Sequence, residues 1–182
     1  FEEYGFEEFL STVYMNVTFA CLLNIIDYAD KEISDKARKA ADLMLEELSL
    51  HTFDGAIIAP MGRVYRGVIN PVRQGAQSLI NLVNPSVPTT YGEGWLSYYA
   101  TSSYRIPDGL ASLMEDAVDT SYSTGNACVS IRKSKDYILT SVASPRRDGR
   151  KRWTNVMLSG VRASEDTHAY TKSFNERFHG TT

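Results

Sequence analysis

The sequence predicts an α+β protein in which antiparallel helical hairpins come first and antiparallel β-strands follow. Within the first fifty residues the apolar positions recur with helical spacing, whereas after about residue 121 they alternate as they do in strands. The composition agrees with a globular chain, because 43% of the 182 residues are hydrophobic and 23% are charged. A chain of this length has ample apolar material for a core.

The first predicted helix starts near Phe6. The side chains that follow the i, i+3, i+4, i+7 spacing of one helix face are mostly apolar, and they are Phe6, Phe9, Leu10, Val13, Tyr14, Val17, Ala20, Cys21 and Asn24. We expect Cys21 to be buried on this face as a small hydrophobic residue. Leu22, Leu23, Ile25 and Ile26 widen the apolar surface, so this helix should be covered on more than one side.

A second helix is predicted from Ser34, a favourable N-cap, to about His51. Asp35 lies in its first turn, where a negative charge complements the helix dipole. Its apolar stripe consists of Ala37, Ala40, Ala41, Met44, Leu45 and Leu48. The connection to the first helix is short and polar, which predicts an antiparallel αα-hairpin.

Glycine and proline recur through residues 52–71, which we therefore interpret as a loop or a short extended segment. A third helix is predicted over residues 72–83, ended by Pro85. Residues 91–99 are aromatic and leave the type of structure open. A further helix follows Pro107 and uses Leu110, Leu113, Met114 and Val118.

Four strands are predicted in the last third of the chain, over residues 128–134, 137–142, 152–158 and 169–178. Asp148-Gly149 is a hairpin signal between two of them. We therefore divide the chain into a helical portion, residues 1–122, and the start of a β domain, residues 123–182. We interpret the whole as a piece of a longer protein.

Charge and motifs exclude several classes of function. A net charge of −3 provides no global field that would recruit nucleic acid, and no apolar run approaches the roughly 18 residues that span a membrane. The basic run from Arg146 to Arg152 could bind an anion, but a solvated hairpin loop explains it better. The nearest approach to a metal site is a set of polar side chains without an established ligand spacing, namely Asp166, His168, Glu176 and His179. We predict neither a metal nor a cofactor.

The most informative stretch is residues 51–66. Arg63 and Tyr65 would share one side of an extended segment, and loops on a rigid scaffold often carry catalytic groups. An arginine can neutralise a carboxylate and a tyrosine can transfer a proton. Those groups would suit proton removal next to a uronate carboxylate, followed by β-elimination. The alternative from spacing alone is a structural arginine that donates to backbone carbonyls.

Several motifs, in chain order, resemble one family. They are Phe9-Leu10-Ser11-x-x-Tyr14, Ala20-x-Leu22-Leu23-Asn24-x-x-Asp27-Tyr28-Ala29, Leu48-Ser49-Leu50-His51-x-Phe53-x-Gly55, Gly62-Arg63-x-Tyr65, Tyr104-Arg105-Ile106-Pro107 and Lys135-Asp136-Tyr137-Ile138-Leu139. The chain is similar in these to bacterial heparinase II/III-like and alginate-lyase-like proteins. The resemblance implies a partial (α/α) toroid of helical hairpins followed by a β-sandwich, with an anionic polysaccharide or oligosaccharide bound between them.

The resemblance also implies the site residues. The predicted catalytic residues are Arg63, Tyr65 and Tyr14, and the predicted substrate-binding residues are Asn16, Arg66, Trp95 and Arg105. Arg63 would neutralise the substrate carboxylate, a tyrosine would serve as base or acid, and Asn16 would supply an amide donor. The family pattern has a histidine before the Gly-Arg-x-Tyr element, where this chain has Met61.

Two other functions fit the same composition. A glycoside hydrolase would need two opposed carboxylates, for which Glu93, Asp108 and Glu176 are available. A non-catalytic sugar-binding protein would stack sugar rings on exposed aromatic side chains, and the candidates are Trp95, Tyr98, Tyr99 and Tyr104.

Overall fold

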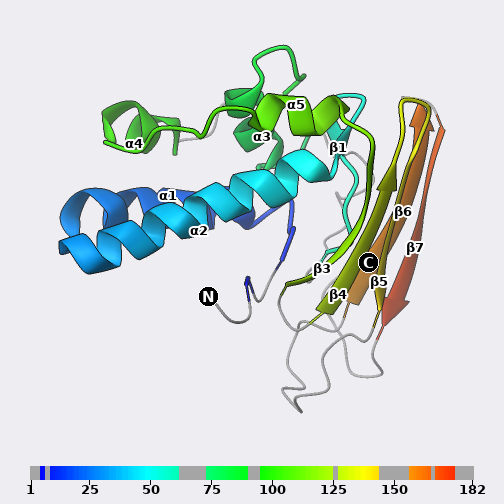
Figure 1. Ribbon diagram of the computed structural model, residues 1–182, viewed down its shortest axis with the longest axis horizontal. Helices are drawn as coiled ribbons and strands as arrows, with labels where there is room; N and C mark the ends of the chain where they lie inside the picture. The colour runs from blue at the N-terminus through cyan, green and yellow to red at the C-terminus, as the bar shows by residue number, and fades with distance from the viewer. Residues whose placement is uncertain are drawn as a thin grey trace.

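A helical layer meets one face of a five-stranded sheet in the computed structural model (Figure 1). The structure describes residues 5–6, 9–61, 73–89, 95–124, 127–143, 156–164 and 167–174, the last two ranges by their backbone alone. The two long helices run side by side, and the second of them ends against the sheet. The protein is therefore of the α+β class, as the change of period near residue 121 predicts.

Helices α1 (Met15–Tyr28) and α2 (Lys31–Leu50) form the predicted antiparallel hairpin. The expected cap of α2 is wrong, because the N-cap is Asp30, whose carboxylate accepts a hydrogen bond from the Ile33 amide. Ser34 instead lies inside the helix and its hydroxyl donates to the Ile26 carbonyl at 2.6 Å. The hydroxyl fastens the second helix to the end of the first.

The buried face of α1 differs from the one that the sequence predicts. The side chains that enter the core are Met15, Asn16, Phe19, Leu23 and Ile26. Val17 is 54% exposed and Cys21 is exposed, so both residues lie on the outer face and the expected burial of Cys21 is wrong. Apolar residues surround this helix on every side, and the sequence period therefore could not decide which face turns inward.

A two-residue hairpin follows α2 and consists of β1 (Thr52–Phe53) and β2 (Ala56–Ile57). Asp54 and Gly55 connect them, and both have the positive φ that a type I′ turn requires, 49° and 69°. This confirms the short extended segment as far as Met61. Residues 62–72 lie outside the described part of the chain.

Three short helices pack on the α1–α2 hairpin: α3 (Gln77–Val83), α4 (Leu96–Thr101) and α5 (Leu110–Glu115). The predicted helices after residue 72 and after Pro107 are confirmed, although each is shorter than expected. Val118, which the helical spacing assigns to the last of them, pairs instead with Lys133 in the sheet. The ambiguous aromatic stretch ends in α4, whose N-cap is Trp95.

The sheet is an antiparallel meander with the order β3-β4-β5-β6-β7. Its strands are β3 (Val118–Thr124), β4 (Ala127–Lys133), β5 (Ile138–Ala143), β6 (Val156–Ser164) and β7 (Thr167–Phe174). All four predicted strands are present in some part of their range. The Asp148-Gly149 turn lies outside the described residues, and the division of the chain at residue 122 stays a prediction.

The main core lies between the helices. Phe19 packs edge-on against Trp95 and Tyr104, with ring centroids 5.5 and 5.7 Å apart, and the Tyr104 phenol donates to Asp42 on α2 at 2.7 Å. A second, smaller cluster joins the β1–β2 hairpin to the sheet, and its members are Phe53, Ala56, Ile58, Ile131 and Ile138. The hairpin therefore lies between the helical layer and the sheet.

A buried lysine connects the helical layer, the β1–β2 hairpin and the sheet. Lys133 at the end of β4 is 2% exposed, and the three N–H groups of its ammonium are shared among four main-chain carbonyls within hydrogen-bond distance. Two belong to the end of α2 and the strand after it, Leu50 at 2.9 Å and Thr52 at 3.1 Å. The other two, Leu113 and Met114, belong to α5. A cation at these helix ends satisfies carbonyls that have no partner within their helices.

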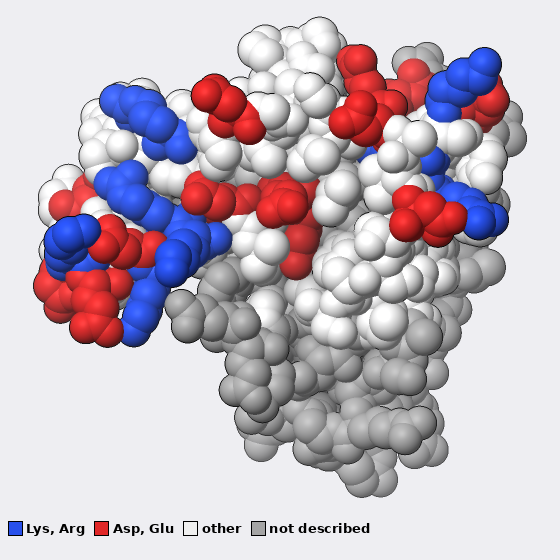
Figure 2. Space-filling view, in the orientation of Figure 1, with Lys and Arg blue, Asp and Glu red and all other residues white. Residues whose placement is uncertain are grey.

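The outer face of α2 is strongly charged. Figure 2 shows acidic and basic side chains interspersed over the tip of the hairpin where α2 begins. Two i, i+4 ion pairs lie there, Lys31–Asp35 at 2.7 Å and Lys36–Glu32 at 2.8 Å. In the part of the chain that the structure describes, none of the helices has the length and apolar character to cross a membrane.

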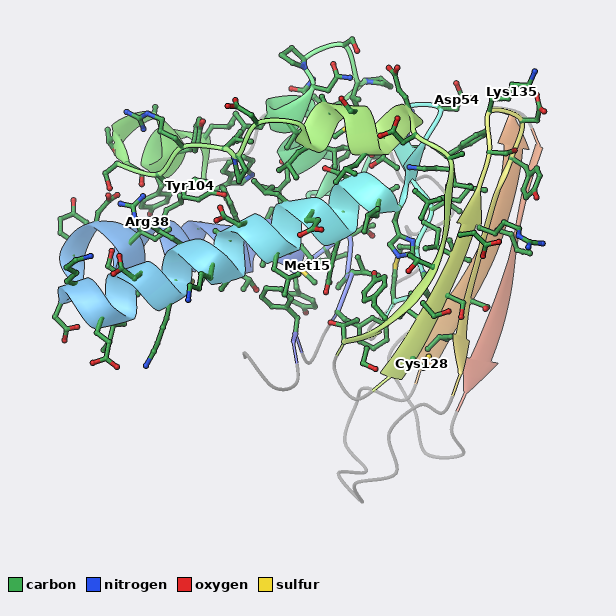
Figure 3. The ribbon with its side chains drawn as sticks, viewed as in Figure 1. Met15, Arg38, Asp54, Tyr104, Cys128 and Lys135 are labelled. Atoms are coloured by element: carbon green, nitrogen blue, oxygen red, sulfur yellow. The ribbon has the colours of Figure 1, made fainter. Side chains whose placement is uncertain are left out.

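Substitution of Lys133 tests its role as the connection between sheet and helices. We expect Lys133→Met to lower the free energy of unfolding by about 3 kcal/mol, because four buried carbonyls lose their donor. Urea denaturation measures the change. Lys135→Met is the matched control, since Lys135 is exposed two residues along the same chain segment (Figure 3). Equal stability of the two variants would contradict this role.

Candidate functional site

The first turn of α1 carries two of the predicted site residues. Tyr14 is the N-cap of the helix and is partly exposed, whereas Asn16 is 5% exposed. Figure 3 marks the neighbouring Met15 at this end of the helix. Just before the turn, Leu10 has a φ of 52° although it is not a glycine. Such a conformation costs of order 1 kcal/mol, and the complete burial of Leu10 holds it in place.

The residues on both sides of residues 62–72 contact Thr12, which lies just before α1. On one side, the Thr12 hydroxyl lies 3.9 Å from the sulfur of Met61. On the other, the Ala76 amide donates to the Thr12 carbonyl at 2.8 Å. Met61, which precedes the segment with Arg63, Tyr65 and Arg66, and Ala76, which follows it, therefore both contact the turn just before Tyr14 and Asn16. The three side chains themselves lie outside the described residues.

Asn16 is packed against the returning chain. A Cβ atom on Gly75 would lie 2.6 Å from the amide nitrogen of Asn16, so the close approach requires a glycine at that position. The Asn16 carbonyl oxygen and the Ser11 hydroxyl are buried without a hydrogen-bond partner among the described residues. Buried polar atoms are rarely left unpaired, which marks this turn as a place where a further polar group is needed.

Trp95 and Arg105 lie elsewhere in the helical layer. Trp95 is 5% exposed, and its indole nitrogen donates to the Ser78 hydroxyl at 3.0 Å; its ring packs within the core and does not face a surface open to a sugar. Arg105 is exposed. One of its guanidinium nitrogens donates to the carbonyls of Ser102 and Tyr104 at 2.8 and 2.6 Å. Arg105 thus has the structural role of an arginine that donates to backbone carbonyls.

The turn that carries Arg105 is fastened to both long helices. Arg38 of α2 donates to the Ser103 hydroxyl at 2.6 Å, and the Ser103 amide donates to Asp27 of α1 at 2.8 Å. Figure 3 shows Arg38 and Tyr104 side by side in this region. Hydrogen bonds from Ser102 and Ser103 outweigh desolvation and lower the pKa of Asp27. Arg105 is therefore held on a fixed element, at a distance along the chain from the turn with Tyr14.

A buried polar cluster that the sequence reasoning missed joins α2 to β3. It consists of Glu47, His51, Tyr122 and Thr124. The imidazole Nε2 of His51 lies 2.8 Å from the Tyr122 hydroxyl, and the Thr124 hydroxyl forms a hydrogen bond with the Glu47 carboxyl. The Glu47-x-x-x-His51 spacing places both side chains on one helix face. That spacing is the signal in the sequence from which the cluster could have been predicted.

Burial controls the charge of this cluster. Desolvation lowers the pKa of His51 to about 3, so the imidazole is neutral. Desolvation likewise raises the pKa of Glu47 to about 8, against the opposing effect of its hydrogen bond with Thr124. The pKa of Tyr122 is also raised, by burial and by the nearby Glu47. At neutral pH all three groups are therefore mainly uncharged, which suits a structural junction.

A cavity of about 320 Å³ lies beside the β1–β2 turn. The lining residues come from the β1–β2 turn, the loop after α3 and the end of α5, and they are Thr52, Asp54, Gly55, Asn84, Ser86, Val87, Pro88, Met114 and Glu115. None of the predicted site residues is among them. Within the described residues, no three His, Cys, Asp or Glu side chains gather as metal ligands would. Among the metal candidates considered above, Asp166, Glu176 and His179 lie outside those residues, and His168 is described by its backbone alone.

Comparison with protein-family models, with curated proteins and with solved structures finds no match to this chain. The functional interpretation therefore rests on the residues and their geometry.

Substitution of Glu47 tests the ionisation of the buried cluster. The folded-state pKa is raised from 4.5 to about 8, so the stabilisation is complete below pH 4.5 and is lost as the pH rises through 8. Glu47→Gln should remove this loss and become progressively more stable than the native chain across that range. Each pKa unit corresponds to about 1.4 kcal/mol, and we expect a difference of a few kcal/mol at pH 8.

Denaturant unfolding at several pH values measures this difference. Glu115→Gln provides the control, because it removes one carboxylate at an exposed position on another helix. A constant difference between Glu47→Gln and the native chain from pH 4 to pH 8 would contradict the buried ionisation.

Proposed function

We propose that this chain is part of a carbohydrate-active protein that cleaves uronate-containing polysaccharides by β-elimination, as a polysaccharide lyase does. The observation that supports the proposal is that residues on both sides of the Arg63-containing segment contact the turn before α1. Thr12 contacts the residues on both sides of that segment, through Met61 and Ala76. Tyr14 and Asn16 follow Thr12 directly in the chain, and Arg63 and Tyr65 lie in sequence between the two residues that Thr12 contacts.

The proposed chemistry assigns one task to each group. Arg63 would pair with the substrate carboxylate and stabilise the enolate that forms when the adjacent carbon loses its proton. Tyr65 or Tyr14 would take that proton and return one to the departing glycosidic oxygen. Asn16 would donate an amide hydrogen bond to the carboxylate. The bond to the leaving oxygen breaks as a carbon–carbon double bond forms, and an unsaturated uronate results.

The toroid and the sandwich are part of the same proposal. One antiparallel helical hairpin followed by an antiparallel sheet is consistent with a portion of each. The substrate would lie on the side of the helical layer where α1 begins. Arg66 would add positive charge there, and Arg105 would contact a more distant sugar from its own rigid turn.

Mutation of Arg63 in the full-length protein tests the proposed lyase activity. Alginate, polygalacturonate, heparan sulfate, chondroitin sulfate and hyaluronan are the substrates, and the ultraviolet absorbance of the unsaturated product measures turnover. We expect Arg63→Ala to lower kcat by about 10²–10³-fold, since it removes the charge that stabilises the enolate. Arg73→Ala should leave the rate unchanged, because Arg73 is exposed at the end of the same segment.

Two results would reject the lyase, and a third would reject the site. New reducing ends without ultraviolet absorbance would indicate hydrolysis. Binding to a polymer without either product would indicate a sugar-binding protein. Equal activity of Arg63→Ala and Arg73→Ala would reject this site even if the protein were a lyase.

Removal of one hydroxyl tests the role of Tyr14. We expect Tyr14→Phe to lower kcat by about 10²-fold or more if this phenol transfers the proton, with little change in KM and in the unfolding midpoint. Tyr65→Phe is the matched variant on the other segment. If only Tyr65→Phe loses activity, Tyr65 is the acid and base; full activity of both variants would exclude a phenol from the proton transfer.

A further inference from the structure

The cavity beside the β1–β2 turn is separate from the proposed lyase site. Its volume of about 320 Å³ is at the lower end of the range of sites that bind small molecules, about 300–1,000 Å³. None of the residues assigned to the lyase chemistry is among the described residues that line it. A ligand in this cavity would therefore be recognised by a different set of side chains.

The cavity has both buried apolar and exposed polar lining residues, which we call its floor and its rim. Val87 and Met114 belong to the floor and are 6% and 5% exposed. Asp54, Ser86 and Glu115 belong to the rim and are exposed. Figure 3 shows Asp54 at the tip of the β1–β2 turn, beside the end of α5. A ligand that fits this lining has carbon atoms to pack on the floor and polar groups to meet the rim.

A buried glutamine fixes two walls of the cavity. The side-chain nitrogen of Gln77 donates to the carbonyl of Gly55 in the turn at 2.6 Å and to the carbonyl of Pro88 in the loop after α3 at 2.8 Å. A Cβ atom on Gly55 would lie 2.8 Å from the Cδ of Pro88, so the turn and the loop are in close contact. The cavity is therefore formed before a ligand arrives, which lowers the entropic cost of binding.

The same glutamine leaves an acceptor without a donor. Gln77 is fully buried, and its side-chain oxygen has no hydrogen-bond partner among the described residues. Buried polar atoms are rarely left unpaired, and this amide group adjoins the cavity through its contacts with Gly55 and Pro88. The carboxylates of the rim are acceptors as well. The chemistry of the lining therefore favours a ligand that donates hydrogen bonds.

The charge around the cavity is negative. Both charged residues among the described lining are acidic, Asp54 and Glu115. The carboxyl ends of α3 and α5 also meet here, since Asn84 is the C-cap of α3 and Glu115 is the last residue of α5, and such helix ends favour a cation. Neither Lys133 nor Lys135 lines the cavity, and four carbonyls already surround the Lys133 ammonium. The cavity would therefore attract an ammonium group and repel a uronate.

We propose that this cavity binds a small hydroxylated ligand that carries an ammonium group, of which an amino sugar is the simplest example. The ammonium group pairs with the carboxylates of Asp54 and Glu115, and the ring carbons pack on the floor. The oxygen of the Asn84 side chain already accepts from the amide and the hydroxyl of Ser86, at 3.1 and 2.7 Å. Its NH₂ group is therefore the donor for a hydroxyl of the ligand. This site does not depend on the proposed lyase activity.

Calorimetric titration of the full-length protein with three sugars of similar size tests the charge of the ligand. At about pH 6 glucosamine is positively charged, glucose is neutral and glucuronate is negative. We expect glucosamine to bind with a Kd of about 1 mM, because the rim carboxylates are exposed to solvent, and glucose and glucuronate to bind progressively more weakly. Added salt should weaken the binding of glucosamine. The proposal would be overturned if glucosamine did not bind, if glucose bound equally well, or if glucuronate bound more tightly.

Two conservative substitutions locate the site. Asp54→Asn suits the positive φ of 49° at that position, and Glu115→Gln keeps a good helix former at the end of α5. Each should weaken the binding of glucosamine about threefold, as expected for one exposed ion pair. Asp108→Asn is the matched control, because Asp108 is an exposed carboxylate just before α5 begins. An equal loss in Asp108→Asn and Glu115→Gln would show an effect of net charge alone and overturn the proposal.

The variant Arg63→Ala separates this site from the proposed lyase site. It should leave the Kd of glucosamine unchanged, because the cavity does not involve that segment. A parallel loss of glucosamine binding and lyase activity would place the sugar at the lyase site and overturn a separate site. Binding of glucosamine by a native protein without lyase activity would reject the proposed function and support the cavity site.

Discussion

The structure depends on one buried ammonium group. Lys133 brings the ends of α2 and α5 and the first residues of the β1–β2 hairpin to the last residue of β4, through four main-chain carbonyls. Burial lowers the pKa of this lysine to about 8, and nearby Asp116 partly counters the shift. The charge is retained at neutral pH because the carbonyls replace the water that burial removes. The helical layer and the sheet therefore meet in a defined orientation.

Around that connection, buried polar groups and possible catalytic groups are separate. Glu47 of α2 and His51 at its end meet Tyr122 of β3, and desolvation shifts the pKa of each in the direction that favours its uncharged form. Groups in that state stabilise a junction more readily than they exchange protons with a substrate. The start of α1 is different, because Tyr14 is partly exposed there and the Asn16 carbonyl has no partner among the described residues. For this reason we place the proposed chemistry at α1.

The short sequence of helix α1 must therefore satisfy three separate requirements. Its inner face packs on α2 through Phe19 and Leu23, and its first turn holds the flanks of the Arg63-containing segment. Its outer face is as apolar as the inner one, which a helix bounded by water on that side would not need.

The sequence by itself determined the class of the fold, the αα-hairpin and the antiparallel strands, because periodicity and turn residues are local signals. It also contains Asp54-Gly55, a hairpin signal, although the glycine and proline residues of the range 52–71 predict only a loop or an extended segment there. Tertiary structure alone decided which face of α1 is buried, because apolar residues lie on all its sides. It likewise decided the N-cap of α2 and the pairing of His51 with Tyr122, 71 positions apart in the chain. The burial of Lys133 could not be predicted from the sequence either, since local sequence does not show which distant carbonyls will surround a charge.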